Sequence, residues 1–178
     1  MSKLNQPPPV LFFIAFIFSE SAGMISCIED LEAEFGVLSF SSKELEFQHS
    51  DYYEAEMGKN LKRMVIGFKN LIERDKLVEI KIFTNSLEEK YSSDERRTIN
   101  IDPGYIAEEH LILATGKGFY HRPYIGKGVY ADLTLVYQQN RFRPLEWTYP
   151  DYASEEMINI FHELRNIYTE KPKEGNYK

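Results

Sequence analysis

The sequence contains a single cysteine, Cys27. One cysteine excludes an internal disulfide, and it leaves too few thiolates for a cysteine-based zinc or iron–sulfur site. Chains that fold without disulfides are typical of reducing compartments. We therefore expect a cytoplasmic protein, and the residue types predict no metal site.

The sequence also lacks a hydrophobic run long enough to cross a membrane. The apolar run at residues 10–18 is short, because a spanning helix needs about 20 residues. Together with Lys3 and Cys27 this run loosely resembles a lipoprotein signal, but Glu20 interrupts the pattern. Apolar residues also continue at helical spacing from Met24 to Phe35, straight through the cysteine. We expect residues 10–18 to form a buried strand, with no membrane partner.

Positive charge is scarce. The chain has 21 Lys and Arg against 28 Asp and Glu, for a formal net charge of −7. Such a field repels nucleic acids and anionic membranes. The Lys/Arg-Gly-Phe/Tyr run that stacks RNA bases on some sheets is missing as well. We therefore expect no nucleic-acid partner.

Common signatures of hydrolases and redox enzymes are missing too. There is no Gly-x-Ser-x-Gly elbow, no His-Glu-x-x-His helix and no Cys-x-x-Cys pair. The glycine and lysine segments at 115–118 and 126–128 lack the spacing of a phosphate-binding P-loop, so we interpret them as turns. Asp51, Glu54 and Glu56 lie near a histidine but match no metal motif, and they suit the N-terminal end of a short helix. The sequence identifies no cofactor.

Hydrophobic and aromatic residues are plentiful, at 43% and 14% of 178 residues. That content can supply one core, so we expect a single domain over 1–178 with flexible ends at 1–9 and 171–178. The periodicities predict strands at 10–18, 37–47, 62–68, 97–101, 130–137 and 141–145, and helices at 21–35, 75–91, 106–114 and 154–168. A short helical turn is expected after Ser50, and Asp102-Pro103-Gly104 is expected to be a turn.

The order of these elements predicts the fold class. A strand, a helix, two strands, a second helix and another strand are followed by a hairpin and a last helix. This order predicts an α+β domain with a ferredoxin-like β-α-β-β-α-β core and a C-terminal extension made of the hairpin and helix. The hairpin turn is expected at Gln139-Asn140.

Two polar clusters are candidates for a functional site. The segment 121–124 places His121, Arg122 and Tyr124 together, so that a guanidinium could hold an anion while an imidazole moves a proton. A capped, solvated loop is the other interpretation. On the second long helix Lys81, Asn85 and Glu88 fall at i, i+4 and i+7, and a ligand could lie along them. An ordinary solvated helix face is the interpretation we favour there.

Five segments spread over nearly the whole chain resemble a prokaryotic family of domains of unknown function. The segments are DYYEAEMG at 51–58, EIK and TNSLE at 79–88, NIDPGY at 100–105, HRPY at 121–124 and WTYPDY at 147–152. The resemblance implies a cytoplasmic domain of about 180 residues and no known catalytic residues. Members are sometimes labelled GTP-binding proteins, but this sequence has neither a P-loop nor an Asn-Lys-x-Asp guanine motif.

The leading hypothesis is a site, enzymatic or ligand-sensing, for a small anionic compound, with phosphorylated compounds included. Its expected residues are Arg122 with Lys81 or Lys62 to neutralise the anion, Asn85 beside them on the helix, His121 as acid or base, Asp102 to orient a partner, and Tyr105 and Tyr124 as walls. The alternative is a non-catalytic module that binds a protein partner or a second copy through the aromatic segment 147–152. For that segment we favour a structural role, as the entry to the last helix.

Overall fold

The computed structural model describes residues 3–20, 22–48, 51–94 and 96–171, apart from the Asp51 side chain. The strands are β1 Val10–Phe18, β2 Leu38–Ser41, β3 Leu45–Glu46, β4 Lys62–Ile72, β5 Ile99–Ile106, β6 His110–Thr115, β7 Tyr124–Gly126, β8 Val129–Gln138 and β9 Arg141–Pro144. The α-helices are α1 Met24–Phe35, α2 Glu54–Met57, α3 Leu77–Lys90 and α4 Glu155–Glu170, with short 3-10 turns at Asp51–Tyr53 and Arg74–Lys76. Residues 171–178 were expected to be flexible, and of these only Lys171 is described.

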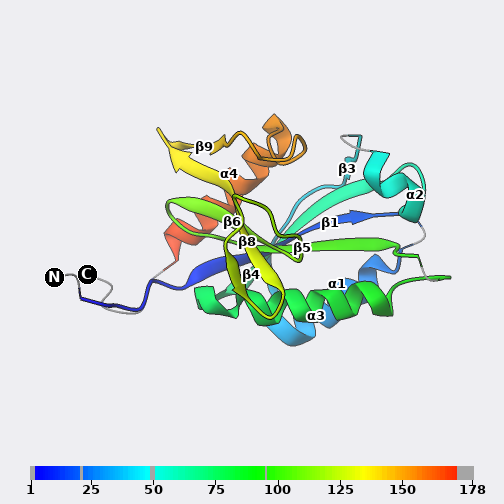
Figure 1. The fold of residues 1–178 in the computed structure, drawn as a ribbon, viewed down its shortest axis with the longest axis horizontal. Helices are drawn as coiled ribbons and strands as arrows, with labels where there is room; N and C mark the ends of the chain where they lie inside the picture. Colours follow the sequence, from blue (N-terminus) through cyan, green and yellow to red (C-terminus); the bar gives the residue numbers. More distant parts are fainter. Residues whose placement is uncertain (1–2, 21, 49–50, 95, 172–178) are drawn as a thin grey trace.

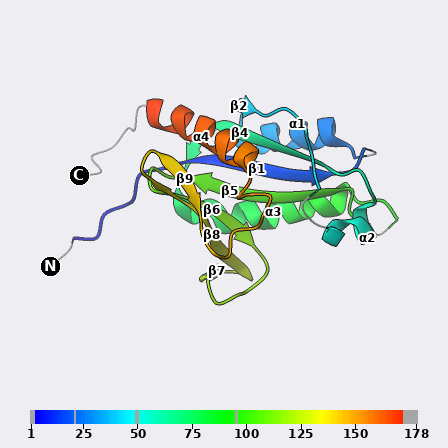
Figure 2. The same cartoon turned by 90° about the horizontal axis from the view of Figure 1, so that it is seen from above.

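One nine-stranded sheet forms the centre of the molecule. Its strand order is β2-β4-β1-β5-β6-β8-β7, with β3 also paired to β4 and β9 to β8, and the pairings are antiparallel. The helices α1 and α3 cover one face and α4 covers the other (Figure 1). Seen from above, β7 projects at one edge (Figure 2). The chain is therefore an α+β protein, as its element order predicts.

Strand β1 is buried throughout because both faces of the sheet are covered at its position. Phe13 packs with the α4 residue Phe161 on one face, whereas Phe12 packs with Leu31 of α1 on the other. A strand that is buried on both sides reads as a continuous apolar run, which explains the sequence at 10–18. None of the described helices is long and apolar enough to cross a membrane.

Local residue types explain where several elements end, and the turn expected at Gln139-Asn140 is confirmed. Gly36 ends α1 with a φ of 88°, a conformation that suits glycine. Gln139 and Asn140 form the β8–β9 turn with φ of 50° and 59°, and the Ser154 hydroxyl caps α4 by accepting a hydrogen bond from the Met157 amide. The predicted cap Ser50 lies outside the described residues.

Three predictions are wrong. The strand expected at 97–101 does not turn at Asp102-Pro103-Gly104; β5 runs through these residues, and Pro103 pairs in register with Ile14 of β1. The segment 106–114, expected as a helix, contributes the end of β5 and most of β6, since a short run that is apolar on all sides does not distinguish strand from helix. The strand expected at 37–47 is interrupted, and forms β2 and β3.

Strands β5 and β6 separate along part of their length. They pair where Gly104 lies opposite Leu113 and Ile106 lies opposite Leu111, while β6 continues along β8 as far as Thr115. Before Gly104 the main chain of β5 therefore has no β6 partner. Pro103, which lacks an amide N–H, lies at this unpaired edge, where a proline is tolerated within a strand.

Candidate functional site

A cavity of about 570 Å³ lies where β5 and β6 separate. Residues of α3 lie along it, as do residues of β4, the segment after β6, the turn before α2 and the segment that leads into α4. Its charged lining residues are the cations Arg63, Lys81, Arg97, Lys117 and Arg122 and the acids Glu88, Asp102, Asp132 and Asp151. Cations thus slightly outnumber acids here, although the whole chain carries a net charge of −7. The cavity is a local exception to the acidic field of the protein.

A buried ionic cluster centred on Arg63 of β4 forms one wall. The Arg63 guanidinium is paired with the Asp151 carboxylate, and its Nη1 lies 3.7 Å from Oδ2 of Asp102. It also stacks over the Tyr152 ring, with its Cζ 4.7 Å from the ring centroid. The Tyr152 hydroxyl donates to Asp102 at 3.3 Å, and burial raises the pKa of this phenol far above its ordinary value. Asp102 is therefore part of a structural ion cluster at the edge of the cavity.

The opposite wall is made by α3. Lys81 Nζ donates to the Ile101 carbonyl at 3.1 Å, and Glu88 Oε1 accepts from the Ile101 amide at 2.6 Å. These two side chains satisfy the main chain of β5 where β6 is no longer its partner. Both are buried, so the interpretation of this stripe as a solvated face is wrong for Lys81 and Glu88, while Asn85 is exposed at the same wall.

Arg97 and Asn100 lie next to Glu88. The Arg97 guanidinium bonds both oxygens of Glu56, at 2.7 and 2.6 Å, and its Nη1 lies 3.5 Å from Glu88 Oε2. The same Nη1 donates to Asn100 Oδ1 at 3.0 Å, which fixes the orientation of that amide. Asn100 Nδ2 is buried, and no acceptor for it lies among the described residues.

Burial raises the pKa of Glu88 above its ordinary value of 4.5, although the Lys81 charge acts in the opposite direction. A raised pKa in the folded state means that Glu88 contributes stability below the pKa of the unfolded chain and that this contribution is lost as the pH rises through the folded pKa. Glutamine keeps the acceptor for Ile101 but does not ionise. The free energy of unfolding of Glu88→Gln, measured relative to that of wild type, should therefore increase as the pH is raised from about 4 to 8. Urea unfolding across this pH range measures the difference, and parallel profiles would contradict it.

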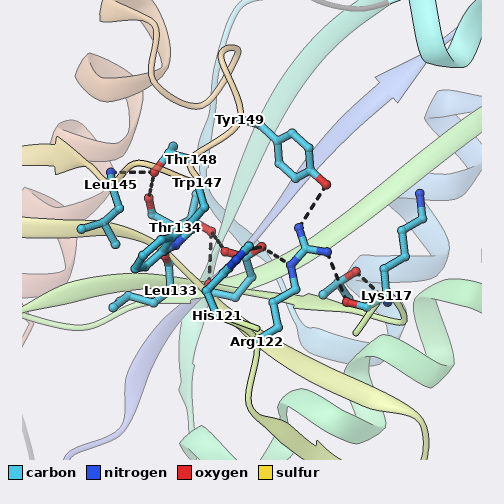
Figure 3. A network of polar contacts seen from close by, with 11 residues as sticks. Lys117, His121, Arg122, Leu133, Thr134, Leu145, Trp147, Thr148 and Tyr149 are labelled. Atoms are coloured by element: carbon cyan, nitrogen blue, oxygen red, sulfur yellow. Dashed lines mark hydrogen bonds and ion pairs between the residues drawn. The ribbon is translucent and has the colours of Figure 1, made fainter. Parts of the chain in front are cut away.

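Arg122 is tied into a network at the mouth of the cavity (Figure 3). Its Nε donates to Asp132 Oδ2 at 2.7 Å, its Nη1 to the Lys117 carbonyl at 3.2 Å, and its Nη2 to the Tyr149 hydroxyl at 3.0 Å. All three of its nitrogens are therefore engaged by the protein itself. These bonds use three of the five N–H donors of the guanidinium and fix Arg122 at the rim of the cavity; its expected role in holding an anion stays a prediction.

His121 lies behind Arg122 and is not part of the cavity lining. Its ring stacks on Trp147 with centroids 4.9 Å apart (Figure 3), and its Nε2 lies 3.8 Å from Asp132 Oδ2. Neither ring nitrogen has a hydrogen-bond partner in the described part of the chain. The Trp147 indole donates to the Leu133 carbonyl at 2.8 Å, so Trp147 packs within the fold, in keeping with the structural role favoured for 147–152.

The other expected residues divide by position. Lys81, Asn85, Asp102 and Arg122 converge on the cavity. Three lie outside its lining: Lys62 pairs with Glu44 on the surface, Tyr105 packs against His110, and Tyr124 is 62% exposed. The sequence reasoning missed Arg63, Arg97, Asn100 and Asp132. The sequence did contain an indication of Arg63. One face of strand β4 is apolar, and Arg63 lies on the other face together with Val65, which indicates that this face is buried as well.

No group of three or more described His, Cys, Asp or Glu side chains is arranged to hold a metal ion. Of the acidic candidates near α2, Glu56 is bound to Arg97, while His49 and the Asp51 side chain are not described. The segment 126–128 is the turn between β7 and β8, with positive φ at each residue, as expected for a turn.

The fold and the cavity define an α+β domain built on one large antiparallel sheet, with a charged cavity where two of its strands separate. The chain belongs to the family described as Domain of unknown function (DUF4416), whose family model matches residues 8–168. This match confirms the resemblance seen in the sequence blocks. No curated protein and no solved structure matches the chain.

Proposed function

We propose that this protein binds a small anionic compound in the cavity between β5 and β6. The observation that carries the proposal is that the buried lining atoms without a hydrogen-bond partner are donors. Two buried side-chain atoms of lining residues have no partner among the described residues, Asn100 Nδ2 and Arg63 Nε, and both are donors. A buried donor without an acceptor is costly, so a ligand that supplies acceptor oxygens fits this site.

Lys81 adds charge to these donors. It is 8% exposed and belongs to the lining, and its ammonium carries three donors, one of which bonds Ile101. No ion pair joins Lys81 to a carboxylate within the described ranges. The arginines, in contrast, are held by Asp151, Glu56 and Asp132. Glu88 is close enough for the Lys81 charge to act on its pKa, but a carboxylate or phosphate beside Lys81 would add the direct, charge-assisted hydrogen bonds that this cation lacks.

Anion binding through Lys81 is testable by calorimetry and thermal shift with inorganic phosphate and with mono- and dicarboxylates. An anion that binds the native state should raise the melting temperature. Lys81→Met should weaken binding about 10- to 100-fold, because hydrogen bonds to charged groups contribute about 1.5–3 kcal/mol. Lys62→Met is the matched control, since it removes a cation on the surface, 34% exposed. No binding by any anion to wild type, or equal binding by the Lys81 variant, would refute the proposal.

We also propose a ferredoxin-like core and a cytoplasmic location. The order β2-β4-β1-β5, with antiparallel neighbours and with α1 and α3 on one face, supports the core arrangement; β6 to β9 and α4 then extend it. The cysteine Cys27 is a buried free thiol whose pKa burial raises to about 12, which is consistent with a reducing compartment. The acidic net charge supports the absence of nucleic-acid and membrane partners.

An interaction module remains the second candidate function. The observation that favours it is a set of exposed aromatic side chains in the β6–β7 segment, where Phe119, Tyr120 and Tyr124 are 60%, 81% and 62% exposed. Exposed aromatic clusters are common at protein interfaces. The segment 147–152 supports this function less, because Trp147 and Tyr152 pack within the fold.

A further inference from the structure

The mouth of the cavity carries two exposed tyrosines, Tyr52 from the turn before α2 and Tyr149 from the segment before α4. Their side chains are 63% and 50% exposed. The Tyr149 hydroxyl accepts from Arg122 Nη2 at 3.0 Å, and Lys117 Nζ donates to the Tyr52 hydroxyl at 2.9 Å. A cation holds each hydroxyl and also lies over part of the ring, with Lys117 Nζ 4.5 Å from the Tyr52 centroid and Arg122 Cζ 5.7 Å from the Tyr149 centroid. The exposed remainder of both rings lies at the mouth.

One continuous network fixes the two tyrosines. Arg122 Nη1 donates to the Lys117 carbonyl at 3.2 Å (Figure 3), so that Tyr52, Lys117, Arg122 and Tyr149 are linked in series. Asp132, which is buried, holds the Arg122 end at 2.7 Å. Rings that are anchored by their polar ends lose little further side-chain entropy when a ligand packs on them, and aromatic faces favour planar partners.

The cavity is also larger than a bare anion requires. Its volume of about 570 Å³ is roughly twenty times the ~30 Å³ share of one water molecule in the liquid. A phosphate or carboxylate beside Lys81 and Asn100 therefore leaves most of the space for the rest of the ligand. That remaining space extends to the rings of Tyr52 and Tyr149, since all four residues line the same cavity.

We propose that the ligand is an aromatic anion, with its carboxylate or phosphate at Lys81 and Asn100 and its planar ring against Tyr52 and Tyr149. This inference rests on the proposed function and specifies its ligand class. The inner donors recognise the charge, and the tyrosine rings at the mouth recognise the planar body. Aliphatic anions of the same charge lack the second set of contacts and bind more weakly.

Matched pairs of probes test the ligand class by calorimetry. Phenyl phosphate is compared with inorganic phosphate, and benzoate with acetate, on the full chain. Stacking of a nucleic-acid base on an aromatic side chain contributes roughly 1–3 kcal/mol, so the aromatic member of at least one pair should bind about 5-fold or more tightly. The affinities of phenyl phosphate and benzoate, compared with each other, then identify whether the site favours a phosphate or a carboxylate.

Variants at the mouth test whether the tyrosines cause the preference for aromatic anions. Tyr149→Leu should reduce the aromatic preference to less than about 3-fold, while Tyr149→Phe, which retains the ring, should keep most of it. Tyr124→Leu is the control, because Tyr124 is an exposed tyrosine that does not line the cavity. Equal affinities within both pairs, or a preference unchanged in Tyr149→Leu, would overturn this inference while anion binding stands. If no anion binds at all, the proposed function fails together with the inference.

Discussion

Replacing Arg63 with methionine should lower the free energy of unfolding by about 3–5 kcal/mol, the range seen when one partner of a buried ion pair is removed. The Arg63 side chain is 3% exposed and Asp151 is 10% exposed, so the substitution leaves a buried carboxylate without its cation. Asp102 and the Tyr152 ring lose the same guanidinium. Urea unfolding monitored by circular dichroism measures the change.

The neighbouring residue offers a matched control. Lys62 lies in the same strand and pairs with Glu44, but the two side chains are 34% and 52% exposed, so Lys62→Met should cost about 1 kcal/mol or less. The double variant Arg63→Met/Asp151→Leu should recover part of the loss, because replacing both charges removes the unpaired carboxylate. A loss in Arg63→Met no larger than in Lys62→Met would contradict a structural ion cluster at this position.

Gly104→Ala should lower the free energy of unfolding by about 2–3 kcal/mol, at the upper end of the usual cost of overpacking. A Cβ at this position would lie 2.5 Å from the Ile112 carbonyl oxygen and 2.7 Å from the Phe13 ring. The carbonyl belongs to the main chain of β6, so it can withdraw only if the short pairing between β5 and β6 opens. Equilibrium unfolding in urea measures the effect.

Gly116→Ala serves as the control for Gly104. Nothing lies within 4 Å of a Cβ built on Gly116, so this variant should change stability by less than about 1 kcal/mol. Gly104 is not among the glycines with positive φ, and a cost at this position would therefore reflect close approach of two strands. If Gly104→Ala were as stable as Gly116→Ala, the close packing of β5 on β6 and Phe13 would be wrong.

The same residue shows where sequence reasoning failed on the fold. Asp-Pro-Gly is a strong turn pattern because proline sets φ and glycine accepts left-handed backbone. Here proline is tolerated because the edge of β5 is unpaired at Pro103, and glycine is required because the neighbouring strand lies too close for a Cβ. Both requirements arise from residues far along the chain. Local periodicity could predict β1, β8, β9 and α4, whose patterns depend only on their own burial.

The candidate site was only partly predictable for a related reason. Lys81 and Glu88 were recognised as one stripe of a helix, but their burial depends on the separation of β5 from β6, which a single sequence does not reveal. His121 and Arg122 were recognised as a polar pair. Only Arg122 lines the cavity, however, because the His121 ring stacks on Trp147, from a segment 26 residues later in the chain.

The contacts that Lys81 and Glu88 make with Ile101 also bear on self-association. An unpaired strand edge is a template on which another chain can add a strand. By occupying the main-chain groups of Ile101, the two α3 side chains close that edge from within the molecule. Substitutions at 81 or 88 therefore change the lining of the cavity and the protection of this strand edge together, so we expect such variants to aggregate more readily than wild type.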